Sequence, residues 1–411
     1  MNSAINTNPD ELTPTSAPEL ARMVEENAAG RRRPLLPVGG RTALQFGYAA
    51  TEPVTIVATS ELSRVIDYPA RDMTVTVEAG LRVEELQKLL KNEGQRLPVD
   101  VAQAHRATLG GAIATNTSGP GRFGHGTLRD YVIGISAVDG TGRLFSAGGR
   151  VVKNVAGYDL CKLLIGSLGT LAIITQVTLK LRPLAEKLQI EWITVDALDR
   201  IDDALAKLLA SQTRPVALEV LNPKAAWQVR SESQQDLPTD RFVLCVAYEG
   251  SEREVNWQAE TLRNELARSE LAESTSLAGD GAKKLCKALI EYQAASDDPL
   301  TFQATLPPSQ TIEFVAAATE AGIALQAHAG NGVIVGHLAD DCSSPEQALA
   351  ILTPLRRLAE RSGGALVVHN CEPEWKLALP VFGTLSAPAG LMQRMKQAFD
   401  PHSLLNPGRF A

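Results

Sequence analysis

Two adjacent glycines near the N-terminus stand in a stretch that could bind an anion. The stretch reads PVGGRTALQFG, and Gly39 and Gly40 are followed directly by Arg41 and Thr42. Because glycine has no Cβ, main-chain N–H groups in such a loop can turn toward one point, which suits a phosphate. The pair also suits an ordinary turn, since the chain next enters the apolar run VTIVAT.

The spacing of this loop excludes the two best-known phosphate motifs. A P-loop needs a lysine followed by Ser or Thr after its last glycine, and a Rossmann fingerprint needs GxGxxG leading directly into a helix. The loop has neither pattern, and it joins two predicted strands. Taken alone, a glycine pair between two strands is therefore more often an ordinary turn than a phosphate site.

A second glycine-rich segment covers residues 97 to 140. It contains TLGG, ATNTSGPG and RFGHG, which is more glycine than a strand connection needs. Glycine lets a backbone pass close to a large flat ligand, and the Ser and Thr hydroxyls supply hydrogen bonds. This reading is favoured over the alternative, a series of tight turns.

A third segment, KNVAGYDLCKLLIGSLGTLAIITQVTLKLRP, combines an apolar helix, a GSLGTL turn and a strand. Alternation along the strand puts Leu171, Ile173, Val177, Leu179 and Leu181 on one face.

The elements around these loops are mostly short strands. PLLPV, VTIVAT, VIDYP and MTVTVEAG are strand candidates within residues 35 to 185. One helix is clear in LRVEELQKLLKNEG, where Val83, Leu86, Leu89 and Leu90 share a face. Gly94 stands where a left-handed helix cap is expected.

From about residue 188 to 370 strands and helices alternate. LQIEWITV, PVALEVLN and RFVLCVAYEG read as strands, and ALDRIDDALAKLLASQ and SEREVNWQAETLRNEL read as helices. Single helices between short strands predict a ferredoxin-like α+β sheet with its helices on one face. The last stretch, LMQRMKQAFDPHSLLNPGRF, predicts an amphipathic helix and a turn-rich tail. The sequence has no clear internal repeat.

Composition narrows the class of protein. The chain has 411 residues, 44% of them hydrophobic, which is enough for two domains. A formal net charge of -7 gives no attraction to nucleic acid or to an anionic membrane surface. No apolar run approaches the roughly 20 residues of a membrane-spanning helix, so we expect no transmembrane segment. A protein that acts on small molecules is the default.

The N-terminus and the cysteines indicate the compartment. MNSAINTNPDELTPTSAPEL is polar, lacks the apolar core of a signal peptide and reads as a frayed segment before a capped helix. The five cysteines are scattered without a CxxC pair, so we expect reduced thiols and no cysteine-ligated cluster. A cytoplasmic protein is predicted, which partner subunits could hold at the inner membrane.

The three glycine-containing blocks together resemble the FAD-binding domain of the vanillyl-alcohol oxidase superfamily, the p-cresol methylhydroxylase type. The resemblance covers residues 34 to 183 in order. It implies an α+β fold in which a two-part FAD-binding domain occupies residues 1–187 and a ferredoxin-like α+β cap domain occupies 188–370. A C-terminal segment, 371–411, would pack back on the FAD-binding domain.

The resemblance also implies which residues bind FAD. The pyrophosphate loop would be Pro37, Val38, Gly39, Gly40, Arg41 and Thr42. The flavin and its ribityl chain would be lined by Pro98, Val99, Asp100, Thr108, Leu109, Gly110 and Gly111. Thr115, Asn116, Ser118, Gly119 and Arg122 would continue along the cofactor, Gly169, Thr170, Ile173 and Ile174 would close over the adenine side, and Asn406 would lie near the flavin. We expect non-covalent FAD, because no histidine or cysteine follows the glycine pair.

Within the superfamily, GYDLCKLLIGSLGTLAIIT and AFDPHSLLNPGRF are similar to the D-2-hydroxy-acid dehydrogenases and glycolate oxidase subunits. Catalytic members of this group bind a divalent metal through HxGDGNxH and a Glu-His pair. Here the first block reads HAGNGVIVGH, with His328 in place, Asn331 for Asp, Val335 for the second His, and His337 two residues too late. We expect no metal, although imidazoles of these histidines converging across adjacent strands would suit zinc or iron.

The second block, GGALVVHNCEPEWK, holds His369 and Glu372 but no Glu-His pair. The catalytic base is not identified by the sequence; His328 is the first candidate and His369 the second. This departure is typical of the E-subunit type of glycolate oxidase. It implies an FAD-bearing accessory or electron-transfer subunit, assembled with a catalytic FAD-containing D-type subunit and an iron–sulfur subunit that oxidise glycolate to glyoxylate.

Two alternatives stay open. The chain could be a self-sufficient flavin dehydrogenase for a small 2-hydroxy acid such as D-lactate, with a base that takes the hydroxyl proton. It could also be a scaffold with an empty FAD fold, against which the intact glycine loops argue.

Overall fold

The computed structural model describes residues 11–50, 52–149, 159–267, 274–294, 298–383 and 389–410. The predicted frayed start of the chain, and residues 153–158 of the helix expected in KNVAGYDLCKLLIG, lie outside these ranges. By its contacts the chain forms two compact units. Unit 1 comprises Met1–Thr117, Thr127–Leu184 and Thr384–Ala411, and unit 2 comprises Ser118–Gly126 and Ala185–Gly383.

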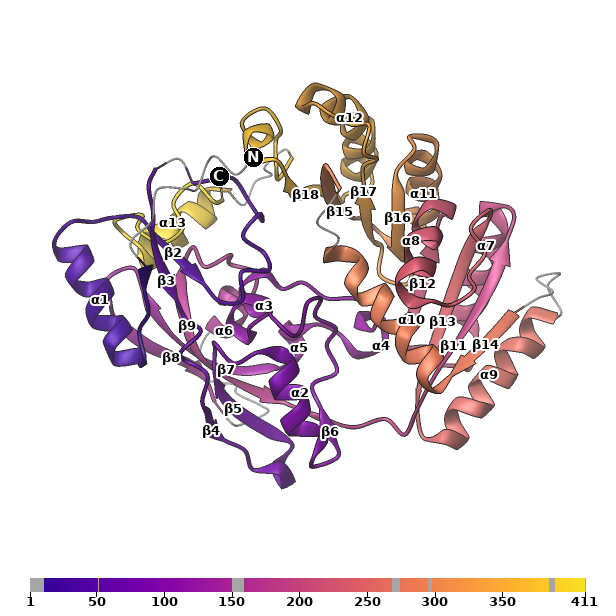
Figure 1. Cartoon of the computed structure of the whole chain (residues 1–411), viewed down its shortest axis with the longest axis horizontal. Helices are drawn as coiled ribbons and strands as arrows, with labels where there is room; N and C mark the ends of the chain where they lie inside the picture. The colour runs from indigo at the N-terminus through magenta and orange to yellow at the C-terminus, as the bar shows by residue number, and fades with distance from the viewer. Residues whose placement is uncertain are drawn as a thin grey trace. The chain divides into compact units, whose positions relative to one another are not determined.

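Unit 1 contains two main sheets (Figure 1). Its strands are β1 (Glu11–Leu12), β2 (Leu35–Val38), β3 (Thr55–Ala58), β4 (Val65–Asp67), β5 (Thr74–Glu78), β6 (Gln95–Arg96), β7 (Val132–Asp139), β8 (Leu144–Gly148), β9 (Ala172–Lys180) and β10 (Arg182–Pro183). Three parallel strands, in the order β1-β3-β2, form one sheet, and five antiparallel strands, β4-β5-β9-β7-β8, form the other. The small pair β10-β6 completes the set. The predicted two-part architecture is confirmed.

The helices of unit 1 are α1 (Ala17–Ala29), α2 (Val83–Lys91), α3 (Leu109–Thr115), α5 (Leu128–Tyr131), α6 (Leu160–Leu164) and α13 (Ala389–Phe399), with the 3-10 turn η1 (Ala70–Asp72). Helix α1 begins at Ser16, whose side chain accepts a hydrogen bond from the Glu19 N–H. Helix α2 buries Val83, Leu86 and Leu90 as predicted, and Gly94 just beyond it has a φ of +64°.

Two apolar clusters hold unit 1 together. The larger lies where α2 and α3 pack on the five-stranded sheet, and it includes Val77, Leu86, Ile113 and Leu179. The smaller joins α1 to both sheets and to the C-terminal tail through Leu20, Leu35, Val57, Ile173 and Leu405. The second cluster therefore attaches residues near both ends of the chain to the same core.

Unit 2 is built on one eight-stranded antiparallel sheet. Its strands are β11 (Lys187–Val195), β12 (Ala217–Leu221), β13 (Phe242–Gly250), β14 (Ser274–Ala278), β15 (Leu300–Thr305), β16 (Ala324–His328), β17 (Val333–His337) and β18 (Ala365–Cys371). Its helices are α4 (Arg122–His125), α7 (Leu198–Ala210), α8 (Pro223–Ser233), α9 (Glu252–Ala267), α10 (Gly279–Glu291), α11 (Thr311–Glu320) and α12 (Pro345–Arg361). The 3-10 turns are η2 (Tyr292–Ala294), η3 (Pro308–Gln310) and η4 (Pro373–Leu377).

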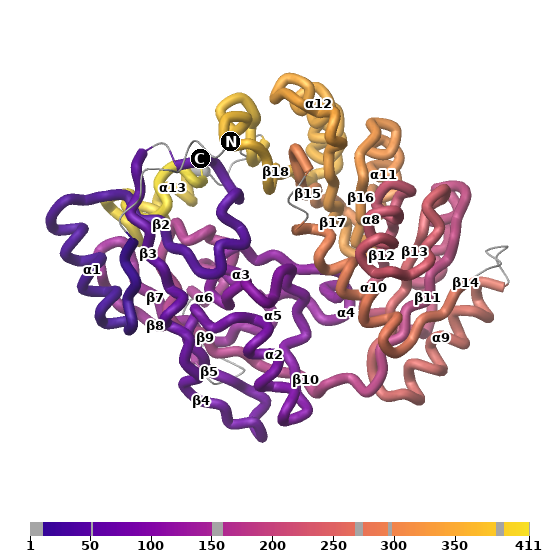
Figure 2. The backbone as a smooth tube through the Cα atoms, viewed as in Figure 1, coloured from indigo at the N-terminus to yellow at the C-terminus, as the bar shows by residue number. Residues whose placement is uncertain are grey.

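The sheet consists of two ferredoxin-like halves in tandem (Figure 2). The strand order is β14-β11-β13-β12 in one half and β16-β17-β15-β18 in the other, and each half has the alternating arrangement of that motif. The halves meet where β12 pairs with β16. The ferredoxin-like prediction is confirmed, but the structure contains two such motifs where the sequence indicated no repeat.

The prediction that all helices cover one face is wrong. Helices α8 and α10 pack with Ile190 and Trp192 of β11 on one face of the sheet. Helix α9 lies on the opposite face, where its Arg263 pairs with Glu191. Helix α11 also lies there, packing Phe314 against Phe302. The connections after β12 and β14 are long enough to hold a helix each, which covers the face that a single ferredoxin-like motif leaves open.

Candidate functional site

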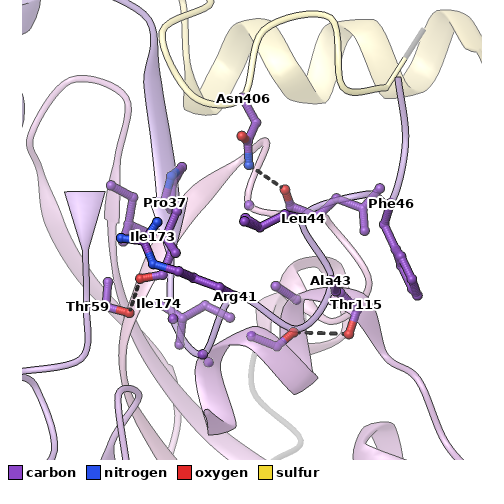
Figure 3. Close-up of a pocket in the computed structure, with 18 of the residues that line it drawn as sticks. Pro37, Arg41, Ala43, Leu44, Phe46, Thr59, Thr115, Ile173, Ile174 and Asn406 are labelled. Atoms are coloured by element: carbon purple, nitrogen blue, oxygen red, sulfur yellow. Dashed lines mark hydrogen bonds between the residues drawn. The ribbon is translucent and has the colours of Figure 1, made fainter. Parts of the chain in front are cut away.

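The glycine loop lies at a cavity within unit 1 (Figure 3). The cavity is lined by Pro37, Val38, Gly39, Gly40, Arg41, Thr42, Ala43, Leu44, Phe46, Thr59, Gly110, Gly111, Ala114, Thr115, Leu168, Gly169, Ala172, Ile173, Ile174, Asn406 and Arg409. The loop between β2 and β3, helix α3, the turn before β9 and the C-terminal tail supply these residues. Four segments far apart in the sequence therefore meet at one concave site.

The two glycines of the loop are required by close packing. A Cβ on Gly39 would overlap the Thr108 side chain, and a Cβ on Gly40 would overlap the carbonyl oxygen of Arg106. The next residue, Arg41, has a φ of +57°, in the left-handed region. Alternation of right- and left-handed backbone turns successive N–H groups toward one side, which is how main-chain nests bind anions. The side chain of Arg41 forms an ion pair with Glu11, with Nη2 2.9 Å from Oε1.

Helix α3 provides the floor of the cavity. Thr108 caps it by accepting a hydrogen bond from the Gly111 N–H at 3.3 Å. The Gly110 N–H donates to the Ala79 carbonyl oxygen at 2.7 Å, so the helix lies directly against the end of β5. Thr115 donates back to the Gly111 carbonyl oxygen. The block TLGG, part of the segment predicted to pass close to a flat ligand, is the N-cap and first turn of a helix, and Gly110 and Gly111 line the cavity.

The C-terminal tail closes one side of the cavity, which confirms that the C-terminal segment returns to the FAD-binding part. The Asn406 side chain donates to the Leu168 carbonyl oxygen at 2.8 Å. Arg409 donates to the carbonyl oxygens of Leu44 at 2.7 Å and Phe46 at 3.0 Å, and burial lowers its pKa. The tail thus fixes both the glycine loop and the turn before β9.

Lys396 of α13 holds the base of the tail. Its Nζ donates to the carbonyl oxygens of Thr170 and Leu405, both at 2.7 Å, and to Asp400 at 2.6 Å. Burial lowers the pKa of Lys396, and the hydrogen bond to Asp400 opposes that shift. All three hydrogen bonds of this ammonium go to the protein itself, and Lys396 does not line the cavity. The charged residues that do line it are Arg41 and Arg409.

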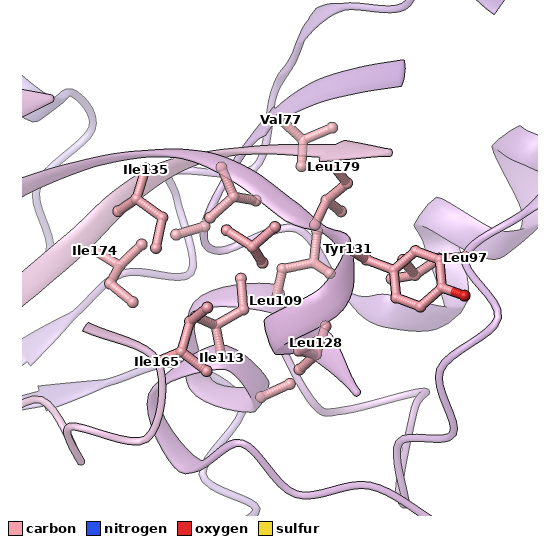
Figure 4. Packing of buried hydrophobic residues seen from close by; sticks show 14 of the residues in the cluster. Val77, Leu97, Leu109, Ile113, Leu128, Tyr131, Ile135, Ile165, Ile174 and Leu179 are labelled. Carbon is pink, nitrogen blue, oxygen red and sulfur yellow. The ribbon is translucent and has the colours of Figure 1, made fainter. Parts of the chain in front are cut away.

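The cavity brings together many of the residues expected to bind FAD. Those that line it are Pro37, Val38, Gly39, Gly40, Arg41, Thr42, Gly110, Gly111, Thr115, Gly169, Ile173, Ile174 and Asn406. Those that do not line it are Pro98, Val99, Asp100, Thr108, Leu109, Asn116, Ser118, Gly119, Arg122 and Thr170. Leu109 is fully buried in the core of unit 1 (Figure 4), and Ser118, Gly119 and Arg122 belong to unit 2. Their predicted contacts with FAD stay a prediction.

Sequence reasoning missed several lining residues. They are Ala43, Leu44, Phe46, Thr59, Ala114, Leu168, Ala172 and Arg409. Leu168 carried a detectable signal, because it lies inside the GSLGTL turn and adopts a positive φ of 53°. Arg409 carried none, since its partners Leu44 and Phe46 are more than 360 residues away.

The residues present fit an FAD pyrophosphate. Gly39 and Gly40 pack too closely on Thr108 and Arg106 to carry a Cβ, and main-chain N–H groups in such a loop can supply the donors that a phosphate needs. The lining includes no histidine or cysteine that could attach a flavin covalently. His125, in the glycine-rich block RFGHG, lies in unit 2 with its Nε2 2.9 Å from Glu249 Oε2.

The segment HAGNGVIVGH, residues 328–337, starts at the last residue of β16. His328 is 3% exposed, and its Nδ1 lies 2.7 Å from Glu219 Oε2 on the neighbouring strand β12. Gln326 donates to the same oxygen at 2.7 Å. Because a carboxylate only accepts, Nδ1 of His328 carries a hydrogen. Glu219 therefore fixes the orientation of this ring from across the sheet.

The other histidines do not join His328. Strand pairing sets His328 opposite Val333 and His337 opposite Ala324, so the two histidines stand at opposite ends of the β16–β17 pair. Four residues of strand separate them by about 13 Å. His337 Nδ1 lies 2.9 Å from Asp298 Oδ2, and Val335 packs in the apolar cluster beneath α8 and α10. The convergence that the sequence left open does not occur for His328 and His337.

His369 lies on β18, a different strand from those that carry His328 and His337. Burial, and then the charge of Lys376, lower the pKa of His369 to about 4, so the ring is uncharged near neutral pH. Across the described ranges, no group of three or more His, Cys, Asp or Glu side chains could hold a metal ion.

Two cysteines can be judged as nucleophiles. Burial raises the pKa of the Cys161 and Cys371 thiols to about 11, which makes them poor nucleophiles.

The fold and the cavity of unit 1 fit a protein that binds a flavin nucleotide. A model for an FAD binding domain matches residues 11–148, and a model for the C-terminal domain of FAD linked oxidases matches residues 186–366 and 386–410. The chain belongs to the FAD linked oxidase family. It uses FAD as its cofactor, as the sequence predicts.

Known proteins with similar sequences are oxidoreductases. Glycolate oxidase subunit GlcD of Bacillus subtilis is 24% identical over 97% of this chain and 88% of its own length. D-lactate dehydrogenase of Archaeoglobus fulgidus is 27% identical over 92% of this chain and 85% of its own. D-2-hydroxyglutarate dehydrogenase of Xanthomonas citri is 26% identical over 91% of this chain and 83% of its own.

A solved structure shares the fold. Alkyldihydroxyacetonephosphate synthase superposes with a TM-score of 0.67 at 18% identity and covers 98% of this chain and 78% of its own. At this identity the likeness concerns architecture alone. Within the part of the chain that the structure describes, no helix is long and apolar enough to span a membrane.

Proposed function

We propose that this chain is the FAD-binding subunit of a complex that oxidises glycolate to glyoxylate, in an accessory or electron-transfer role. The observation that carries the proposal is the separation of the three histidines of unit 2. His328 is held by Glu219, His337 by Asp298, and His369 lies on another strand. A metal that orients a 2-hydroxy acid needs several ligands around one ion, and this donor set does not supply them.

The roles of the chain's own residues in the first unit follow from the cavity. The main chain around Gly39 and Gly40 binds the pyrophosphate, while Asn406 and Arg409 keep the tail against the loop. Bound FAD would supply the redox chemistry of its flavin. The protein contributes binding, orientation and exclusion of water.

The partners in this proposal are a catalytic FAD-containing D-type subunit and an iron–sulfur subunit. The similarity to a glycolate oxidase subunit supports the proposal. The five cysteines are scattered singly in the sequence, so electrons that reach this chain's flavin would leave through a partner's cluster. Those partners would also set whether the complex lies at the inner membrane.

A second candidate is a self-sufficient dehydrogenase for a small 2-hydroxy acid. The Glu219–His328 pair favours it, because an imidazole whose Nδ1–H is held by a carboxylate presents Nε2 as a hydrogen-bond acceptor. His369, uncharged near neutral pH, is the alternative base. The similarity to D-lactate and D-2-hydroxyglutarate dehydrogenases supports this candidate.

Reduction of the bound flavin by substrate separates the two functions. The FAD-loaded chain is mixed without oxygen with glycolate or D-lactate, and bleaching of the flavin is followed with and without the partner subunits. We expect little bleaching by the isolated chain and rapid bleaching in the complex. Bleaching of the isolated chain at about 1 per second or faster, the lower end of ordinary turnover, would establish the dehydrogenase instead.

A further inference from the structure

A second cavity, of about 380 Å³, lies within unit 2 at the start of helix α8. It is bounded by α8, the loop before β15, the beginning of β16 and the end of β17. The lining residues are Pro223, Lys224, Trp227, Gln228, Thr239, Asp298, Gly322, Ala324, His337, Leu338, Ala339 and Asp340. The size suits a small organic molecule or ion.

His337 is the deepest polar residue of this cavity. Its side chain is 0% exposed, and Nδ1 carries a hydrogen because its partner, Asp298 Oδ2 at 2.9 Å, only accepts. Nε2 is fully covered and has no hydrogen-bond partner among the described residues. A buried polar atom without a partner costs free energy, so such an atom in a cavity wall indicates a missing donor.

Gln228 provides a second atom of the same kind. Its Oε1 is covered by protein and also lacks a partner within the described ranges. In the uncharged imidazole Nε2 accepts hydrogen bonds, as does Oε1 of the amide. Two of the residues that line the cavity, from the different elements α8 and β17, therefore each carry a covered acceptor without a donor among the described residues.

The charges around the cavity point the same way. Asp298 and Asp340 contribute two carboxylates, and Lys224 contributes one ammonium, whose Nζ already donates to the Gly322 carbonyl oxygen at 2.8 Å. Trp227, which is 64% exposed, also lines the cavity. Aromatic faces attract organic cations, most strongly those of tryptophan.

We infer that this cavity binds a small organic ammonium ion. Its N–H groups would donate to His337 Nε2 and Gln228 Oε1, its charge would face Asp298 and Asp340, and its alkyl part would lie against Trp227. An anion would meet two carboxylates and two acceptors, so it is disfavoured. The inference does not rest on the proposed role in glycolate oxidation, because none of these residues lines the cavity of unit 1.

The test is a titration of the FAD-loaded full-length chain with ethylammonium chloride. Binding is followed by NMR of ¹⁵N-labelled histidine rings, with the His337 signal assigned by its loss in His337→Gln. Sodium chloride keeps the ionic strength constant, and the comparison probes are tetramethylammonium, which has no N–H donor, and sodium acetate. We expect a saturable shift of His337 Nε2 with ethylammonium, and at least severalfold weaker binding of tetramethylammonium.

Surface variants then locate the site without disturbing the core. Trp227→Ala should weaken binding about two- to fivefold, the range of an exposed cation–π contact, while Trp257→Ala on α9 should not change it. Asp340→Asn should weaken binding, whereas Asp341→Asn next to it should have a smaller effect. Gln228→Leu, which removes the acceptor and keeps the volume, should weaken ethylammonium more than tetramethylammonium.

Three results would each overturn the inference. The first is the absence of any saturable shift of His337. The second is acetate binding as tightly as ethylammonium, which would mean that the ring donates to an anion. The third is equal effects of each variant and its control, which would place the cation elsewhere on the surface.

Discussion

Asn406 and Leu168 are 238 residues apart in the chain, and a hydrogen bond of 2.8 Å joins the Asn406 Nδ2 to the Leu168 carbonyl oxygen. The main-chain N–H of Asn406 also donates to the Leu35 carbonyl oxygen at 2.9 Å, at the start of β2. One residue of the tail therefore fixes the turn before β9 and the strand that leads into the glycine loop.

We expect Asn406→Ala to lower the affinity for FAD. The change leaves the Leu168 carbonyl oxygen without its donor, which costs about 1–3 kcal/mol for a buried group. The tail would then loosen on one wall of the cavity. The measurement is flavin retained after gel filtration at several dilutions, with His402→Ala, exposed on the same tail, as the control. Equal retention by both variants would show that the tail is not needed for binding.

Gly40→Ala should abolish FAD binding, and the reason is steric. A Cβ at this position overlaps the Arg106 carbonyl oxygen, so the loop must move away from the segment that precedes α3. Gly149→Ala is the matched control, because a Cβ there meets nothing within 4 Å. Flavin content per chain is measured together with circular dichroism. Stoichiometric FAD in the folded Gly40 variant would mean that the pyrophosphate is bound elsewhere.

Acid precipitation should release the flavin into the supernatant. The lining of the pyrophosphate cavity has no histidine or cysteine, and neither residue follows the glycine pair in the sequence, so we expect FAD to be held without a covalent bond. Colour that stays in the pellet would contradict this expectation. His125→Ala would then be the first variant to prepare, with His105→Ala as its control.

The stability of the protein should fall as the pH drops from 6.5 toward 4, in part because of His369. Its pKa is lowered from 6.5 to about 4 in the folded state, by burial and then by Lys376. In this window the unfolded chain binds the proton and the folded chain does not, so protonation favours unfolding. The full shift corresponds to about 3 kcal/mol at most.

The measurement for this prediction is the urea midpoint as a function of pH. His369→Asn should flatten the curve between pH 6.5 and 4, because the group that protonates on unfolding is gone. His402→Ala, which removes an exposed histidine, should leave the slope as it is. A His369 variant with the slope of the unmodified protein would show that other groups cause the acid sensitivity.

The glycine loops were predictable from the sequence because their signal is local. A Cβ clash or a positive φ is set by a few neighbouring atoms, so Gly39, Gly40 and Gly94 could be interpreted one at a time. The part played by Arg409 was not predictable, since an arginine that donates to distant carbonyl groups looks like any other arginine.

Whether the histidines of unit 2 lie close together depends on strand register, which the sequence does not reveal. From the sequence, His328 and His337 are nine residues apart, and only the pairing of β16 with β17 places them at opposite ends. Glu219 was missed for the same reason, because it reaches His328 through a strand pairing across more than 100 residues. The two ferredoxin-like halves share a topology, but their sequences show no clear internal repeat, so the second half was not predicted.

The junction between these halves is short. Only three residue pairs join β12 to β16, and one of them is the buried pair Glu219 and His328. By comparison, nine pairs join β11 to β13 within one half. A sheet opens most readily where its ladder is shortest, so amide hydrogen exchange through partial opening should start along this line. Helix α8 contacts both β12 and β16, so it holds the two halves of the sheet together across this short junction.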